Sequence, residues 1–166
     1  MKVIDFLKLD AIIAELAATT KAGTLSELAN HMARLDPKVD ASELRRVLEE
    51  RELLASTAIG DGIAVPHVRN PIVLNVSRPM VTLCFLERPV DFGALDGKPV
   101  HVLFSLICPT TRSHLQMLSR LSFALHDPQL KAVVLRQGPR EEVLREARRV
   151  EAGLAAPAAA EGKATP

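Results

Sequence analysis

The residues best suited to chemistry lie in one short stretch, residues 60–69, which runs Gly-Asp-Gly-Ile-Ala-Val-Pro-His-Val-Arg. Residues 63–65 predict a short buried strand, and Pro66 ends it because proline has no N–H to donate to a sheet. His67 is then expected at a strand edge, held firmly yet open to solvent. Arg69 has the same parity as His67, so in an extended chain both side chains lie on one face. An imidazole beside a guanidinium is typical of a site that receives negatively charged oxygens.

A second histidine, His114, lies in a stretch that predicts a capped helix start, residues 110–114, with the helix running to about Leu125. His114 precedes Leu118 by four residues, so it is expected at the top of the buried face, in the first turn. Unpaired backbone N–H groups and the helix dipole favour an anion there. The alternative, a partly exposed histidine in an ordinary first turn, is equally compatible with these residues alone.

Arg51 is a third candidate, near the end of a helix that Asp40 and Glu43 open with a capping signal. It follows Val47 by four residues and Leu48 by three, so it continues their buried stripe. This spacing predicts an arginine that leans inward at the helix end, within reach of the start of the Gly60 turn. The alternative is that Arg51 belongs to the solvated charged run around it.

Taken together, these residue types favour phosphoryl transfer. They are the two histidines and the arginines that can flank them, Arg51, Arg69 and Arg112. Neutral imidazole is a competent nucleophile toward phosphorus near neutral pH. The phosphohistidine that forms carries up to two negative charges, which helix N–H groups and guanidinium groups stabilise. No metal or other cofactor is expected if the donor is another phosphohistidine.

Composition excludes several other functions. The 166 residues suffice for one domain with a core, and 21 basic against 20 acidic residues give no broad attraction to nucleic acid or anionic membrane. Tyr and Trp are absent, which argues against stacking on single-stranded nucleic acid. Without a signal peptide or a long apolar run, a cytoplasmic protein with no membrane insertion is expected. Cys84 and Cys108 lie in apolar runs, where cysteine behaves as a small hydrophobic residue.

Helices come first in the chain and strands interleaved with helices follow. This order predicts an α/β fold, a single domain with a central mixed β-sheet flanked by helices on both faces. The domain is expected to cover residues 1–152, and an Ala- and Pro-rich tail at 153–166 is expected to be disordered. The expected helices lie within residues 10–35 (two helices, broken at 21–23, the second capped by Thr24 with Glu27), 40–51, 110–125, 128–136 and 141–150. The expected strands are residues 63–65, 80–86 and 100–107, with Pro89 and residues 91–97 in a loop.

His101, near the start of the last strand, is expected to be a packed histidine. A metal site built from His67, His101 and His114 is a weaker alternative, because the three lack ligand spacing and carboxylate partners.

Several motifs resemble one family. They are Gly60-x-Gly62-Ile63-Ala64-Val65-Pro66-His67, preceded by Arg51-Glu52-Leu53-Leu54 and Ser56-Thr57; Val90-Asp91-Phe92-x-x-x-Asp96-Gly97-x-Pro99-Val100; Val102-Leu103-Phe104; and Pro109 with His114-Leu115. They resemble the EIIA component of the bacterial phosphoenolpyruvate-dependent sugar phosphotransferase system, of the fructose–mannitol class. Within that class the chain is most similar to the stand-alone, nitrogen-related EIIA proteins. The resemblance covers about residues 10–150 and implies a mixed sheet between helices.

The resemblance also implies roles. His67 would be the phosphorylated residue, taking its phosphate from the phosphocarrier protein HPr or a nitrogen-branch paralogue; His114 would orient or stabilise the phosphoryl group and Arg51 would bind it. Candidates for further support of the phosphate are Arg69, Arg112, Ser113 and Thr57. Val68 and Ala58 depart from the family pattern, and Val68 could narrow the approach to the histidine.

Three functions stay open at this point. The first is a phosphoryl-transfer protein with a regulatory, nitrogen-related output through target proteins. The second is a sugar-specific EIIA that passes phosphate to an EIIB domain during fructose- or mannitol-type uptake. The third is a binding module whose histidine no longer turns over. The same site residues serve the first two, so these residues do not separate them.

Overall fold

Five strands form one sheet in the computed structural model, which describes residues 12–155. Their order is β1-β4-β5-β3-β2; β1 is parallel to β4 and β3 to β5, whereas β4–β5 and β2–β3 are antiparallel. The strands are β1 (Ile12–Leu16), β2 (Ala58–Gly60), β3 (Ile63–Ala64), β4 (Met80–Val90) and β5 (Val100–Ile107). The helices are α1 (Lys21–Leu35), α2 (Ala41–Leu54), the 3₁₀ helix η3 (Pro71–Leu74), α3 (Thr111–Ala124), α4 (Pro128–Leu135) and α5 (Arg140–Ala155).

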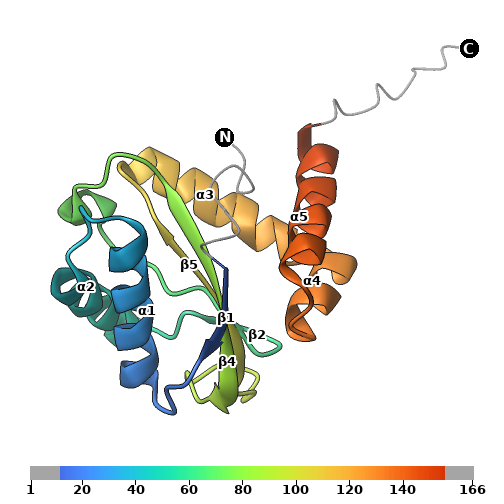
Figure 1. Ribbon diagram of the computed structural model, residues 1–166, viewed down its shortest axis with the longest axis horizontal. Helices are drawn as coiled ribbons and strands as arrows, with labels where there is room; N and C mark the ends of the chain where they lie inside the picture. Colours follow the sequence, from blue (N-terminus) through green and yellow to red (C-terminus); the bar gives the residue numbers. More distant parts are fainter. Residues whose placement is uncertain (1–11, 156–166) are drawn as a thin grey trace, which may run out of the picture.

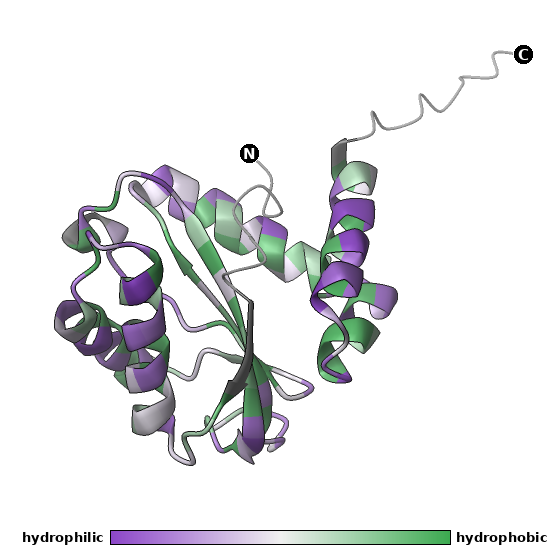
Figure 2. Cartoon of the chain, in the orientation of Figure 1, coloured by the Kyte–Doolittle hydropathy of each residue, from purple (hydrophilic) through white to green (hydrophobic). Residues whose placement is uncertain are grey.

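Helices cover both faces of this sheet, which confirms the expected architecture. Helices α1 and α2 lie on one face, and α3, α4 and α5 lie on the other (Figure 1). Hydrophobic and hydrophilic residues are interspersed along the helices (Figure 2), and the buried residues of α1 to α4 are mainly apolar. Each face has its own hydrophobic core, one with side chains from α1 and α2 and one with side chains from α3, α4 and α5.

The two central strands supply side chains to both cores. On β5, Val102, Phe104 and Leu106 belong to the core under α3–α5, whereas Leu103 and Ile107 belong to the core under α1 and α2. Strand β4 alternates in the same way. Alternation with period two is what a strand buried on both faces requires.

A tight hairpin joins β2 to β3 and fixes the start of the 60–69 stretch. Asp61 and Gly62 form its turn, and both have positive φ, 54° and 81°. Two such residues are what a type I′ hairpin turn needs, and Asp-Gly is a favoured pair. Gly62 is also required sterically, because a Cβ there would lie 2.5 Å from the ring of His101. The Gly-Asp-Gly segment therefore contains a defined hairpin turn. Strand β2, which precedes this turn, was not predicted from the sequence.

The N-terminal expectation was wrong in two respects. Residues 12–16 form the edge strand β1 beside β4, not a helix. Helix α1 begins at Lys21, capped by Thr20, whose side chain accepts a hydrogen bond from the N–H of Gly23. The expected break at 21–23 is thus the first turn of α1. Thr24 lies inside the helix, where its hydroxyl donates to the carbonyl of Thr20.

Other boundaries shift by a few residues. Strand β4 continues through Pro89 to Val90, with irregular pairing after Phe85 that accommodates the exposed proline. Helix α5 continues to Ala155, so residues 153–155 are helical and not part of a disordered tail. The remaining part of that expected tail, and residues 1–11 of the expected domain, lie outside the described residues.

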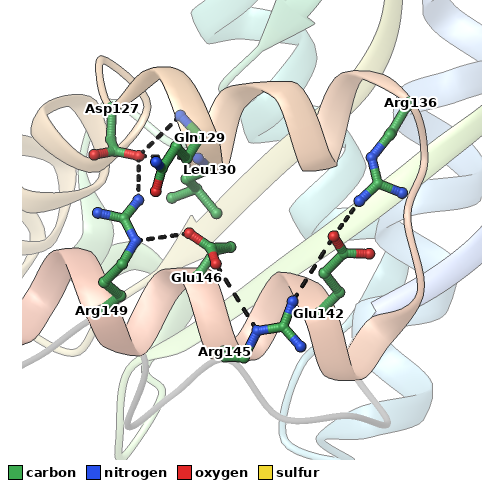
Figure 3. A network of polar contacts seen from close by, with 8 residues as sticks. All are labelled: Asp127, Gln129, Leu130, Arg136, Glu142, Arg145, Glu146 and Arg149. Carbon is green, nitrogen blue, oxygen red and sulfur yellow. Dashed lines mark hydrogen bonds and ion pairs between the residues drawn. The ribbon is translucent and has the colours of Figure 1, made fainter.

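An ion-pair network ties α4 to α5 (Figure 3). Asp127 caps α4 by accepting from the N–H groups of Gln129 and Leu130, and it also pairs with Arg149 of α5 at 2.5 Å. Arg149 in turn contacts Glu146. At the other end, Arg136, Glu142 and Arg145 continue the network. Because these pairs are largely exposed, each contributes little to stability, and the apolar core carries most of the packing energy.

Candidate functional site

The candidate site lies where two parallel strands end. Strands β3 and β5 run in the same direction, so the segments that follow them leave the same edge of the sheet. His67 comes after β3, and the first turn of α3, with His114, comes after β5. In open α/β sheets this edge is the usual place for a binding site.

His67 is held by backbone contacts on the central strand. It forms an isolated parallel bridge with Leu106, and Ser105 donates a hydrogen bond of 2.8 Å to the carbonyl of Pro66. Its Nδ1 lies 2.7 Å from the carbonyl oxygen of Val65. Because that oxygen can only accept, Nδ1 carries the proton, and the neutral ring keeps its lone pair on Nε2. The predicted strand-edge position of His67 is thus confirmed.

The electrostatics of His67 favour the neutral ring. Burial is the largest cause that lowers its pKa below 6.5, and the nearby positive charge of Arg51 lowers it further. The hydrogen bond to Val65 and the negative charge of Glu52 act in the opposite direction. A lowered pKa leaves most of the imidazole unprotonated, and so nucleophilic, at neutral pH.

The two predicted histidines lie together. The ring centroids of His67 and His114 are 5.5 Å apart, and the ring planes are tilted by 42°. His114 is 4% exposed, and its Nδ1 has no hydrogen-bond partner among the described residues. Burial, with a smaller effect from His67, lowers the pKa of His114 to about 4. The reading of His114 as a partly exposed surface residue is therefore wrong.

Arg51 and Arg69 line one open hollow of about 280 Å³ beside the site, together with Arg46, Glu50 and Leu54 among others. Arg51 is half-buried in the last turn of α2, and its Nη1 donates 2.9 Å to the carbonyl of Ala55. Its positive charge is one of the causes that lower the pKa of His67. The prediction that Arg51 leans inward is met only in part, because its side chain is half-buried and donates to the end of its own helix. Arg69 is exposed.

The three remaining candidates differ in their surroundings. Arg112 is exposed in the first turn of α3. Ser113 forms a capping box with Thr110, so its hydroxyl already has partners within the turn. Thr57 is buried, and its hydroxyl donates 2.7 Å to Glu52. Thr57 therefore contacts the histidine segment through its backbone, because its carbonyl accepts from the N–H of Val65 at 2.9 Å.

Glu52 was not among the predicted site residues, although it stands in the Arg51-Glu52-Leu53-Leu54 motif. Its side chain is 5% exposed although it stands in a run of charged residues. A signal was present, because Glu52 follows the buried residues Leu44 and Leu48 at successive intervals of four. That spacing continues the inner face of the helix.

His101 lies away from the two site histidines. It pairs with the hairpin end of β3, where its backbone N–H donates to the carbonyl of Gly62, whereas His67 bridges to Leu106. Five residues of strand span about 16 Å, so the three histidines do not form one metal site. Val68 is fully buried in the core under α1 and α2, so it packs away from the open side of His67.

Comparison with known proteins identifies the family. Residues 5–147 match the family model for the phosphoenolpyruvate-dependent sugar phosphotransferase system, EIIA 2, and the chain belongs to this family. A nitrogen regulatory protein of Pseudomonas aeruginosa is 38% identical over 127 residues, which cover 75% of this chain and 80% of that protein. A fructose-specific EIIA component of Haloferax volcanii is 32% identical over 140 residues, 81% of this chain and 87% of that protein.

A solved structure supports the same assignment. The nitrogen regulatory protein IIA-Ntr of Neisseria meningitidis superposes with a TM-score of 0.76 at 27% identity, covering 87% of this chain and 98% of that one. Within residues 12–155, no helix is both long enough and apolar enough to cross a lipid bilayer.

Proposed function

We propose that this chain is a phosphoryl carrier of the phosphotransferase system that takes phosphate from an HPr-type carrier onto Nε2 of His67. The observation that carries the proposal is the hydrogen bond from Nδ1 to the carbonyl of Val65. This bond directs the lone pair to Nε2, on a ring whose pKa is lowered and which lies beside His114.

The proposed transfer of the phosphoryl group from the donor histidine to His67 needs no cofactor. The Nε2 lone pair forms a bond to phosphorus while the N–P bond of the donor phosphohistidine breaks and its electrons return to the donor ring. The Nδ1 proton of His67 stays in its hydrogen bond to the carbonyl of Val65, so the phosphorylated ring is positively charged. That positive charge offsets part of the negative charge on the phosphoryl oxygens, and the carbonyl of Val65 stabilises it. No metal is required because both donor and acceptor are imidazoles.

Two neighbours suit a phosphoryl group on His67. The guanidinium of Arg51 supplies positive charge and planar donors, which match phosphoryl oxygens. His114 supplies a buried ring nitrogen that lacks a partner among the described residues. Buried polar atoms in proteins generally have partners, so an atom of this kind suits a site that is filled during turnover. Arg69 and Arg112 add exposed positive charge, and Ser113 and Thr57 support the two segments that carry the histidines.

A regulatory output in the cytoplasm, through target proteins, is the favoured role. Its support is the similarity to proteins named as nitrogen regulatory proteins, at 38% and 33% identity. The second candidate is a sugar-specific EIIA that passes phosphate to an EIIB domain, and it is supported by the fructose-specific component that is 32% identical. Wild-type growth of a deletion strain on fructose and mannitol would favour the regulatory role, and loss of growth on either would favour the transport role.

The test of carrier function is phosphorylation in a reconstituted system. The chain is incubated with phosphoenolpyruvate, the first enzyme of the system and an HPr-type carrier, and acid-labile phosphate is measured per chain. We expect the wild type to take up one phosphate, and His67→Ala to take up none.

His126→Ala is the matched control, because His126 is an exposed histidine on the α3–α4 connection whose Nδ1 also lies beside a carbonyl oxygen. It should label like the wild type. An unlabelled wild type, or equal labelling of His67→Ala, would show that the proposal is wrong and would leave the binding-module reading.

A further inference from the structure

We infer that Glu52 is a positioning residue for His67: its buried carboxylate holds Thr57, and through Thr57 and Val65 it fixes the ring orientation that presents Nε2. The inference rests on the function proposed above. It assigns to Glu52 a role that is exerted through other residues and not by contact with phosphate.

An unbroken series of hydrogen bonds connects Glu52 with His67. The two carboxylate oxygens of Glu52 accept from the N–H and the hydroxyl of Thr57 at 2.9 and 2.7 Å. The carbonyl of Thr57 accepts from the N–H of Val65 at 2.9 Å. The carbonyl of Val65 accepts from Nδ1 of His67 at 2.7 Å. A displacement of Thr57 therefore moves the oxygen that selects the tautomer of His67.

The other side of Glu52 is anchored as well. Nζ of Lys21, at the start of α1, lies 2.8 Å from Oε1 of Glu52 and also donates 3.1 Å to the carbonyl of Phe92. Ser56, next to Thr57, donates 2.5 Å to the same carbonyl. The carboxylate is thus clamped between α1, the loop after β4 and the segment before β2. A buried charge with this many partners is well placed to hold a geometry, although buried ion pairs are weak evidence for added stability.

Glu52 also acts on His67 electrostatically. Arg51 and Glu52 from α2 affect the pKa of the His67 ring through their charges, and the ring of His114 from α3 lies 5.5 Å away, centroid to centroid. Burial and Arg51 lower the pKa of His67, and Glu52 raises it. The carboxylate therefore keeps the imidazole more basic, and so a better nucleophile, than burial alone would leave it. Geometry and charge act in the same direction.

The simpler alternative is that Glu52 only ties the end of α2 to the start of β2. A purely structural role predicts changes in stability but no specific change in the ring of His67. The experiment must therefore report on the ring itself and on the reaction, in a folded protein.

The test uses Glu52→Gln, which keeps the size of the side chain and removes its charge. Nitrogen-15 NMR of the histidine rings gives the tautomer and the pKa of His67, and a quench assay gives the initial rate of phosphoryl acceptance. Glu49→Gln is the matched control, because Glu49 is a partly exposed carboxylate on the same helix that pairs with Arg45. His126 serves as the internal reference for the NMR.

We expect Glu52→Gln to lower the pKa of His67, to raise the fraction of the Nδ1-unprotonated tautomer and to slow acceptance by about 10- to 100-fold. That range is typical when the partner behind a metal-bound histidine is lost, and we take it as the guide for His67. Glu49→Gln and the His126 signals should match the wild type. A folded Glu52→Gln with unchanged ring signals and a rate within about twofold of wild type would overturn the inference.

Two further results are decisive. If Glu52→Gln does not fold, Thr57→Val takes its place, because this variant removes only the 2.7 Å hydrogen bond from the hydroxyl of Thr57 to Glu52. A folded Thr57→Val whose His67 ring signals match the wild type overturns the inference. If the wild type itself accepts no phosphate, the proposed function fails. The ring measurements need no phosphoryl donor, so they test the positioning role of Glu52 separately.

Discussion

Acid should destabilise this protein through one buried imidazole, and replacing it should remove that sensitivity. The perturbation is His114→Gln, which substitutes a neutral amide for a histidine that is 4% exposed. Burial holds the pKa of His114 at about 4 in the folded chain, whereas 6.5 is its ordinary value. As the pH falls from about 6.5 to about 4, His114 becomes protonated in the unfolded chain but stays neutral in the folded chain. Stability due to the neutral ring is therefore complete above about pH 6.5 and is lost as pH falls to about 4.

The magnitude follows from the width of that window. Each pH unit is equivalent to about 1.4 kcal/mol, so the full effect is about 3 kcal/mol, and about 2 to 3 kcal/mol of it falls between about pH 7 and pH 4.5. For a domain of this size, that is a large part of a typical stability of about 5 to 15 kcal/mol.

The assay is urea unfolding followed by circular dichroism at a series of pH values. The quantity compared is the loss in free energy of unfolding between about pH 7 and pH 4.5, and it should be smaller in His114→Gln than in wild type by about 2 kcal/mol. His126→Gln, which changes an exposed histidine, should follow the wild type. Parallel losses in wild type and His114→Gln would refute the reasoning, because they would show that His114 is protonated equally easily in both states.

Three other outcomes are expected. An NMR titration should place half-protonation of His67 below pH 6.5, because burial lowers its pKa, and a midpoint above 6.5 would contradict this. Gly62→Ala should destabilise the fold by about 1–3 kcal/mol in thermal unfolding, because φ is +81° and the new Cβ meets the ring of His101. Gly93→Ala should cost less, because its φ is also positive but its Cβ would meet open space, so equal losses would count against the steric argument. Asp127→Ala removes the N-cap of α4 and should lower the free energy of unfolding by about 1 kcal/mol. Asp127→Asn keeps a capping oxygen and should lower it less, so equal losses would show that the cap is unimportant.

The parts of the fold that the sequence predicted are those with a long, unambiguous pattern. Strand β5 has the predicted bounds because its apolar run is bounded by prolines on both sides. Strand β1 was misread because residues 12–16 contain too few positions to separate a helical stripe from a buried strand. The capping signal of Thr24 and Glu27 was misleading, because Thr20, four residues earlier, caps the helix. Only Thr20 has an extended backbone, which tertiary structure decides.

The site was predictable to the extent that local signals marked single residues. Pro66 and the helix start near residue 110 indicated the positions of His67 and His114, and the structure brings the two rings within 5.5 Å. Their partners were harder to find. The contacts of Glu52 with Thr57 and with Lys21 join segments whose proximity depends on how the helices pack on the sheet. In addition, Glu52 stands in a run of charged residues, so its burial is hard to predict from the sequence.

Strand β5 has a consequence for how this protein tolerates change. Its side chains alternate between the two hydrophobic cores, so sliding it by one position would bring each set to the wrong face and empty both cores at once. His67 is bridged to Leu106 on this strand, and His114 follows seven residues after its end at Ile107. Strand β5 therefore fixes the positions of both imidazoles. Substitutions in α4 and α5, which carry none of the candidate site residues, are therefore expected to leave the spacing of the pair unchanged.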